Sequence, residues 1–541
     1  MPTNPSTLRG QQAVKLSVTV KSNLESKYDP AALKRINAAI KRWIDADKKR
    51  GIQTVHVAVD DPADTYLKKL RVTPVSGKAT APKIKRAVDD LWKKLKPEYL
   101  VLFGGIDVVP MFEVLNPAYD QNGDNDEKVP TDNPYASSKR FSSLKRISYL
   151  VPDRVVGRIP DMLADPGDNG RNSDPAWFVA YLKTARFWKA QDKTFYAGPL
   201  YAICTRESKD AGLDCLRYIA REDSPLFLSP PITDGSSPAR KRLSAPVHMI
   251  KCHGSQFRPV FYGEKEIHKQ TKFLKAIRSA TLESRLTSAT LVTTMCCYGA
   301  QIYSPFDPKA KYRGEWPLAS TYLRKGALAF VGSTMKAWVG SPVEKKWADV
   351  LAAGYLKNVL VGSSIGRAFL DSKTAYAYSI IDQGRILSLA DEKTLIEYVL
   401  MGDPSIHPVA SAVPKGLLPD EERRRRRVIS QRLARGLRNL LPERRPPGRA
   451  EPTMAKKVFA KVKRGLAKDV RKRLKEFNIK PTAARVSKLD ISLDDGIAQP
   501  LKEYYWSGQR AEDGYHKQAC LVKAQIDRNG TLCRTSVAYS S

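Results

Sequence analysis

The chain has 541 residues and a formal net charge of +36 at pH 7, because 92 lysines and arginines outnumber 56 aspartates and glutamates. Hydrophobic residues make up 42% of the sequence, which excludes wholesale disorder, and no apolar run approaches the roughly 20 residues of a membrane-spanning helix. The seven cysteines are sparse and odd in number, which favours reduced thiols over a disulfide framework.

The first part of the sequence alternates between strand-like and helix-like segments. The patterns predict strands at 13–20, 54–59 and 99–103 and helices at 30–50 and 81–95. Asp29 before Pro30 has the residue types of a helix N-cap and first helical position. Strands that alternate with helices form a mostly parallel sheet, so we predict a first α/β subdomain at 1–195, with a loop at 116–147.

The same alternation returns after Gly198. We expect strands at 201–205, 247–252, 289–295 and 327–331 and helices at 211–222 and 316–325. These elements predict a second α/β subdomain at 196–412, and therefore an α/β fold with two subdomains.

A basic segment follows the second subdomain. Residues 421–480 contain 22 lysines and arginines and six acidic residues, a net of +16. Apolar residues recur there at four-residue spacing and predict an amphipathic basic helix: Val458, Val462, Leu466, Val470 and Leu474. Such a helix binds nucleic acid, an anionic membrane surface or an acidic partner, or it docks its apolar stripe on the protein itself. We therefore predict a basic helical linker at 413–483 and a small C-terminal β-rich module at 484–541.

Two predicted strands of the second subdomain end in residues that carry chemistry. One strand runs into the sequence HGS, which starts at His253, and another runs into CCYG, which starts at Cys296. Ligands bind at the carboxyl ends of strands in open parallel sheets. A cysteine near a histidine can form a reactive thiolate, and glycines beside both residues let backbone N–H groups approach a substrate carbonyl.

The order of six sequence segments resembles that of the gingipain-type peptidases, family C25 of the caspase-like (clan CD) cysteine peptidases. The segments are PEYLVLFGGIDVVP, TDNPYA with PDRVVGRIP, CHGSQFRPVFYG, TTMCCYGAQ, GALAFVGSTMKAWVGSP and LMGDPSIHPV. They cover roughly residues 30–410. The resemblance implies a caspase-like fold in which residues 196–412 form the catalytic subdomain.

The resemblance assigns the central catalytic roles to His253 and a cysteine. The gingipain pattern has glycine three residues after the nucleophile, which favours Cys296, whereas the caspase pattern has glycine two residues after it and would select Cys297. His253 would protonate the leaving amine and then activate water. The N–H groups of Gly254 and Cys296 would hold the oxyanion.

The resemblance also suggests three supporting residues. Glu207 stands where gingipains have the acidic residue that acts with the histidine. Asp214, with Asp210 as the alternative, matches the acidic residue that binds a basic P1 side chain. Trp338 resembles the aromatic residue of the same pocket, on which a guanidinium could stack.

We therefore expect a cysteine endopeptidase that cleaves protein or peptide substrates after Arg or Lys, and that cleaves itself at Arg423–Arg427. A non-catalytic protein, either nucleic-acid-binding or a pseudopeptidase, is the alternative. The chemistry needs no cofactor or metal, and His516, Cys520 and Cys533 are too few and poorly spaced for a zinc site. No secretory signal is visible at the N-terminus, so we expect a cytoplasmic location.

Overall fold

The computed structural model describes most of the chain. The described residues are 13–121, 123–142, 147–164, 173–264, 273–340, 346–381, 387–410, 443–444, 448–466, 468–490, 501–511, 517–526 and 531–540. The Arg423–Arg427 run lies outside them.

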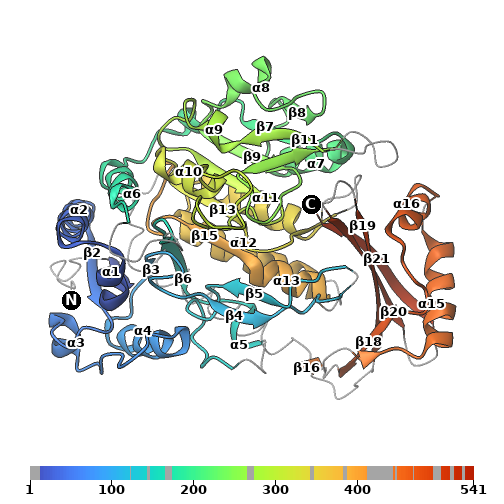
Figure 1. Cartoon of the computed structure of the whole chain (residues 1–541), viewed down its shortest axis with the longest axis horizontal. Coiled ribbons are helices and arrows are strands. Elements are labelled where there is room, and N and C mark those ends of the chain that lie inside the picture. The colour runs from blue at the N-terminus through green and yellow to red at the C-terminus, as the bar shows by residue number, and fades with distance from the viewer. Residues whose placement is uncertain are drawn as a thin grey trace, which may run out of the picture.

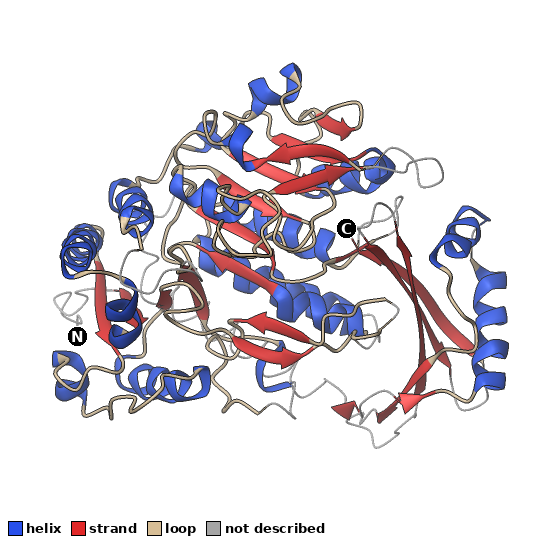
Figure 2. Ribbon diagram, viewed as in Figure 1, coloured by secondary structure: helices blue, strands red, loops and turns tan. Residues whose placement is uncertain are grey.

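A ten-stranded sheet forms the centre of the molecule (Figures 1 and 2). Its strands, in spatial order, are β2 (Ile52–Ala58), β1 (Ala13–Thr19), β3 (Tyr99–Phe103), β6 (Val155–Ile159), β15 (Tyr398–Met401), β13 (Ala329–Ser333), β12 (Leu291–Thr294), β9 (Val247–Lys251), β7 (Tyr201–Thr205) and β8 (Leu226–Ser229). Strands such as β3 (YLVLF) are buried along their whole length, which explains why they are continuous apolar runs. The predicted α/β class with a mostly parallel sheet is confirmed.

The two predicted halves share this one sheet, because β15 joins them. It pairs parallel with β6 and antiparallel with β13. All strands from β2 to β15 are mutually parallel, and so are those from β13 to β8, so the two groups run in opposite directions. The carboxyl ends of β7, β9, β12 and β13 therefore meet at one edge of the sheet, and those of β1, β3 and β6 lie at the other edge.

Helices connect the strands. The longer ones are α2 (Pro30–Lys49), α4 (Ala81–Leu95), α6 (Ala176–Phe187), α7 (Lys209–Tyr218), α11 (Ala348–Leu360), α12 (Ile365–Ile381) and α13 (Leu389–Glu397). The shorter ones are α1 (Lys21–Lys27), α3 (Thr65–Leu70), α5 (Ile147–Leu150), α8 (Ser237–Arg242), α9 (Ser279–Leu282), α10 (Leu318–Arg324) and the 3-10 helices at Lys193–Tyr196 and Arg206–Ser208. The predicted start of α2 is confirmed, because the Asp29 side chain accepts a 2.7 Å hydrogen bond from Ala32 N.

A buried ion pair joins the first strand to the end of the second half (residues 196–412). Lys15 Nζ lies 2.7 Å from Asp403 Oδ2 and 2.6 Å from Asp47 Oδ2, and Trp43 Nε1 donates to the same Asp403 oxygen at 2.9 Å. Asp403 belongs to the sequence GDPS that follows β15. That motif therefore anchors β15 between the two halves.

Two antiparallel hairpins lie outside the central sheet. They are β4 (Phe112–Leu115) with β5 (Lys128–Thr131), and β10 (Val260–Gly263) with β11 (Leu274–Arg278). The prediction of a loop at 116–147 is wrong in part, since β5 lies within it. Four residues that include a proline, KVPT, are too short for a periodic strand signal.

A second sheet contains the C-terminal strands and one short strand of the second half. Its order is β14 (Trp338–Val339), β21 (Leu532–Ser540), β20 (Lys517–Ile526), β19 (Leu501–Ala511), β18 (Arg485–Asp490) and β16 (Glu443–Arg444), with β17 (Gly448–Arg449) also paired to β18. We call β16–β21 the C-terminal sheet; Figure 1 shows it in orange and red beside the second half.

The basic helix docks its apolar stripe on the protein itself. It forms α15 (Pro452–Gly465) and α16 (Lys468–Leu474), followed by a 3-10 helix at Lys475–Phe477. Val458, Val462 and Leu474 are buried in one core with Trp506 and Val522 of the C-terminal sheet. Within the described residues, no helix is long and apolar enough to cross a membrane.

Candidate active site

His253 follows β9 at the edge of the sheet where the strands of the second half have their carboxyl ends. Its backbone pairs with Tyr262 of β10, with N···O distances of 2.9 and 2.8 Å. Its ring packs against Phe273 at 4.8 Å between centroids, and its Nε2 lies 2.9 Å from Oε2 of Glu264. Both side chains are buried, at 8% and 2% exposed. A carboxylate that holds Nε2 leaves Nδ1 as the ring nitrogen for proton exchange.

Glu264 was missed at the sequence level. The prediction placed Glu207 beside the histidine, and Glu207 lies after β7 in the 3-10 helix Arg206–Ser208. The two segments are neighbours, because Arg206 N donates a 3.0 Å hydrogen bond to Glu264 O. The signal that could have identified Glu264 is an acidic residue directly after the apolar run VFYG, 11 residues from His253.

The two adjacent cysteines follow β12 and direct their sulfurs to different neighbours. Cys296 Sγ accepts a hydrogen bond from Cys252 N at 3.3 Å and lies 3.7 Å from Ile250 O, on the β9 side. Cys297 Sγ lies 3.7 Å from Ala337 O, just before β14. In the described part of the chain, neither sulfur hydrogen-bonds to His253.

Both thiols are shielded from water. Cys296 is 0% and Cys297 4% exposed. Burial raises the pKa of Cys296 far above its ordinary value, and burial likewise raises the pKa of Cys297 to about 12. The reactive form of cysteine is the thiolate, so the thiols are in their unreactive form in this conformation at neutral pH.

Gly254 packs directly on the loop that carries Cys296 and Cys297. A Cβ at this position would lie 1.7 Å from the carbonyl oxygen of Cys297, so only glycine fits. The N–H groups of Gly254 and Cys296 have no hydrogen-bond acceptor among the described residues. Unsatisfied N–H groups beside a buried sulfur are suited to hold a developing oxyanion.

The two residues predicted to bind a P1 side chain lie on separate elements. Asp214 is on α7, where its carboxylate forms an ion pair with Arg217. Trp338 is in β14 and is fully buried, and its Nε1 donates to Asp124 Oδ2 at 3.2 Å.

A loop of the first half reaches this edge and was not predicted to do so. Tyr298 OH donates to Asp126 at 2.9 Å, and Lys336 Nζ donates to Asn125 Oδ1 at 2.9 Å. Asp124 also forms a buried ion pair with Lys393. Residues 123–126 therefore contact Tyr298, which follows the two cysteines, and the segment at 336–338.

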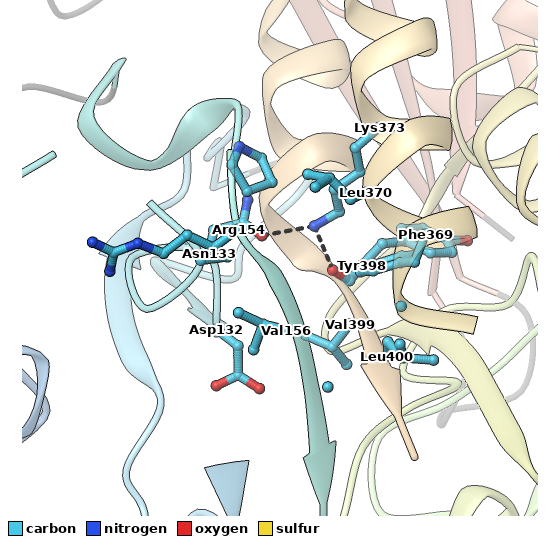
Figure 3. A pocket seen from close by; sticks show the side chains of 14 residues that line it. Asp132, Asn133, Arg154, Val156, Phe369, Leu370, Lys373, Tyr398, Val399 and Leu400 are labelled. Carbon is cyan, nitrogen blue, oxygen red and sulfur yellow. Dashed lines mark hydrogen bonds between the residues drawn. The ribbon is translucent and has the colours of Figure 1, made fainter. Parts of the chain in front are cut away.

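A small cavity lies elsewhere, between β6, β15 and α12 (Figure 3). Its volume of about 20 Å³ has room for one water and not for a peptide side chain. Lys373 Nζ donates to Asn133 Oδ1 at 2.7 Å and to Tyr398 O at 2.8 Å (Figure 3). Burial lowers the pKa of Lys373 to about 7.

The described residues contain no group of three or more His, Cys, Asp or Glu side chains that could hold a metal ion. His516 lies outside the described residues, and Cys520 is buried in the C-terminal sheet.

Comparison with protein-family models matches Peptidase family C25 over residues 28–162 and 255–409, which is more than half of the chain. The chain belongs to peptidase family C25. This family, that of the gingipains, is part of clan CD, so this C25 peptidase acts on proteins or peptides. The second matched segment contains both candidate cysteines and Trp338, whereas His253 and Glu207 lie between the two segments.

Other comparisons add less. The search of curated proteins finds no match. Among solved structures, a chain described as "Structure of Protease" shares 12% identity with a TM-score of 0.48, and the alignment covers 96% of this chain and 97% of that one.

Proposed function

We propose that this C25 peptidase is a cysteine endopeptidase whose nucleophile is Cys296 and whose acid and base is His253. The observation that carries the proposal is the buried His253–Glu264 pair at the sheet edge where the two cysteines follow β12. A carboxylate on Nε2 fixes the orientation of the ring and stabilises it when it becomes charged.

The mechanism would proceed through an acyl-enzyme. The Cys296 sulfur gives its proton to Nδ1 of His253 and attacks the scissile carbonyl carbon, while the N–H groups of Gly254 and Cys296 hold the oxyanion. His253 returns the proton to the leaving amine as the C–N bond breaks. Water then loses a proton to the same nitrogen and attacks the thioester, which releases the acid and restores the thiol.

Two observations support Cys296 over Cys297. Gly299 follows Cys296 by three residues, as in the gingipain pattern. The Cys296 sulfur also lies 3.3 Å from the backbone N of Cys252, the residue before His253, whereas the Cys297 sulfur is directed to Ala337 beside β14.

We further propose that the enzyme prefers Arg or Lys at P1. The support is the resemblance of the Trp338 and Asp214 segments to the gingipain pocket, in which a cation stacks on the indole face. In a panel of reporters with Arg, Lys, Ala or Asp at P1, the basic substrates should be cleaved fastest. Asp214→Asn should reduce that preference more than Asp210→Asn, and equal cleavage of all four reporters would reject it.

Self-cleavage at Arg423–Arg427 follows from that preference. Mass spectrometry of the wild type, compared with Cys296→Ala, should detect cleavage in this run only in the wild type. An intact wild-type chain under conditions where it cleaves another substrate would contradict self-processing.

The catalytic proposal is tested by comparing the activity of matched variants. Hydrolysis of a peptide reporter should be lost in His253→Ala and Cys296→Ala and retained in Cys520→Ala, which removes a buried thiol of the C-terminal sheet. Loss in Cys297→Ala with activity in Cys296→Ala would transfer the nucleophile role to Cys297. Hydrolysis that survives in His253→Ala and in a variant lacking both cysteines would reject the cysteine-peptidase mechanism.

A further inference from the structure

The short strand β14 lies beside the nucleophile loop. The Cys297 sulfur is 3.7 Å from the carbonyl oxygen of Ala337, the residue before β14. Tyr298 N also donates a 2.7 Å hydrogen bond to Met335 O in the same segment. Extended peptides commonly bind proteins by adding a strand to an exposed strand edge. The position of β14 suits it to receive the backbone of a peptide that enters the site.

Both edges of β14 are occupied. On one edge β21 pairs with it antiparallel, with Trp338 opposite Ser540 and Val339 opposite Tyr539. On the other edge Val339 bridges to Trp347. A peptide could therefore add to the outer edge of β14 only after β21 had left it.

The two faces of the C-terminal sheet pack against different parts of the molecule. Side chains alternate between faces along a strand, and the burial follows this period. One face packs in the same core as Cys296 and Trp338, through Tyr505, Ala519, Leu521 and Ala538. The alternate residues pack against α15, among them Tyr504, Cys520, Val522 and Val537. The apolar residues of the first face therefore cover the catalytic half.

The loop at 123–126 adds a second contact between the sheet and the site. Gln509 Nε2 donates to Gly123 O, and a Cβ on Gly123 would lie 2.5 Å from Ser507 Cβ. Lys336 Nζ donates to the same Gly123 oxygen at 3.2 Å. β19 is thus joined through this loop to the segment that leads into β14.

We propose that the C-terminal sheet holds the enzyme closed, because β21 occupies the edge of β14 to which the substrate backbone would add. This inference rests on the proposed function. The partner that fits the freed edge is an extended peptide, and β21 is its intramolecular competitor. Burial of both candidate thiols is consistent with the closed state.

Two variants of the chain should open this contact, and one matched variant should leave it closed. A chain ending at Ala538 lacks both residues that pair with β14, and Ala538→Asp places a charge on the face that covers the catalytic half. Ala483→Asp adds the same charge at an exposed position after α16. Circular dichroism and thermal melting check that each protein is folded.

The first measurement needs no turnover. Iodoacetamide alkylation of Cys296 and Cys297, followed by peptide mass mapping, should be about tenfold faster or more in the two opening variants, since a population shift toward the open state of that size exposes the thiols proportionally. Ala483→Asp should react at the wild-type rate. Wild-type alkylation rates in both opening variants, or an equal acceleration in Ala483→Asp, would overturn the proposal.

The second measurement separates this inference from the catalytic one. Reporter hydrolysis should rise in the opening variants and disappear when Cys296→Ala is added. Faster alkylation of the opening variants, without hydrolysis by any form of the protein, would support closure by the C-terminal sheet and reject the peptidase mechanism. Equal hydrolysis by the full chain and both opening variants would support the peptidase mechanism and reject closure by the C-terminal sheet.

Discussion

Glu264 Oε2 lies 2.9 Å from Nε2 of His253, and the two residues meet because β10 folds back along the segment that carries the histidine. Because the pair is buried, water does not displace the carboxylate from the ring nitrogen. A negative partner at Nε2 fixes the tautomer that presents Nδ1 to a thiol.

Glu264→Gln should lower kcat by about 10²–10⁴-fold with little change in KM, because the amide no longer stabilises the charged ring or fixes its tautomer. The pH profile of kcat should shift as well, which a purely structural role would not cause. Glu207→Gln is the matched control and should retain most of the activity. Loss of activity in Glu207→Gln, with activity retained in Glu264→Gln, would assign the acidic partner of His253 to Glu207, as expected from the sequence.

Gly254→Ala should abolish hydrolysis and destabilise the fold by about 1–3 kcal/mol, the usual cost of overpacking, since its Cβ would lie 1.7 Å from the carbonyl oxygen of Cys297. Urea denaturation and the reporter assay measure the two effects. Gly198→Ala is the control, because its Cβ would meet no atom within 4 Å. A fully active Gly254→Ala enzyme would contradict the close approach.

Asp403→Asn should destabilise the protein by about 1–3 kcal/mol, because it removes the charged acceptor that Lys15 and Trp43 share in the core, while Asp47 still pairs with Lys15. The comparison is Asp61→Asn, which breaks the exposed pair with Lys21 and should cost about 0–1 kcal/mol. Both values come from the free energy of unfolding in urea. Equal effects of the two substitutions would show that the buried pair does not anchor β15.

The buried Lys373 ammonium makes the free energy of unfolding of the protein depend on pH. Its pKa is about 7 in the folded chain because of burial, compared with about 10.4 for an unperturbed lysine. Between these values the unfolded chain binds the extra proton, so this group makes the protein more stable as pH rises from 7 to about 10. Below pH 7 both states are protonated, and its effect is constant.

Lys373→Met should therefore flatten the rise in unfolding free energy between pH 7 and about 10, measured by urea denaturation at several pH values. Subtracting the variant from the wild type removes the contribution of other groups. An unchanged slope would mean that Lys373 titrates near its ordinary pKa in the folded protein.

The local elements were largely predictable from sequence. The α4 helix occupies the predicted residues 81–95, because its apolar residues have helical spacing and its interactions are local. β3 and β7 were also predicted correctly, since a fully buried strand is a continuous apolar run. β15 was missed as a strand, because the four residues YVLM carry no periodicity and their partners are distant in the sequence.

The candidate site was predictable only in part. The positions of His253 and Cys296 after apolar strands follow from the pattern of the sequence. Glu264 could not be assigned to His253, because the hairpin that brings the two together depends on pairing between β10 and the segment after β9. The pairing of Trp338 with Ser540 could not be predicted from the sequence either, since it joins parts of the chain with unrelated sequence patterns.

The position of β15 has a consequence for synthesis of the chain. β6 can pair with β3 once residue 159 has been made, but its second parallel neighbour, β15, is made only at 398–401, after every other strand of the second half. During translation the first half therefore presents an unpaired strand edge, which favours association with other chains. We expect nascent chains that stop before residue 398 to aggregate or to be held by chaperones.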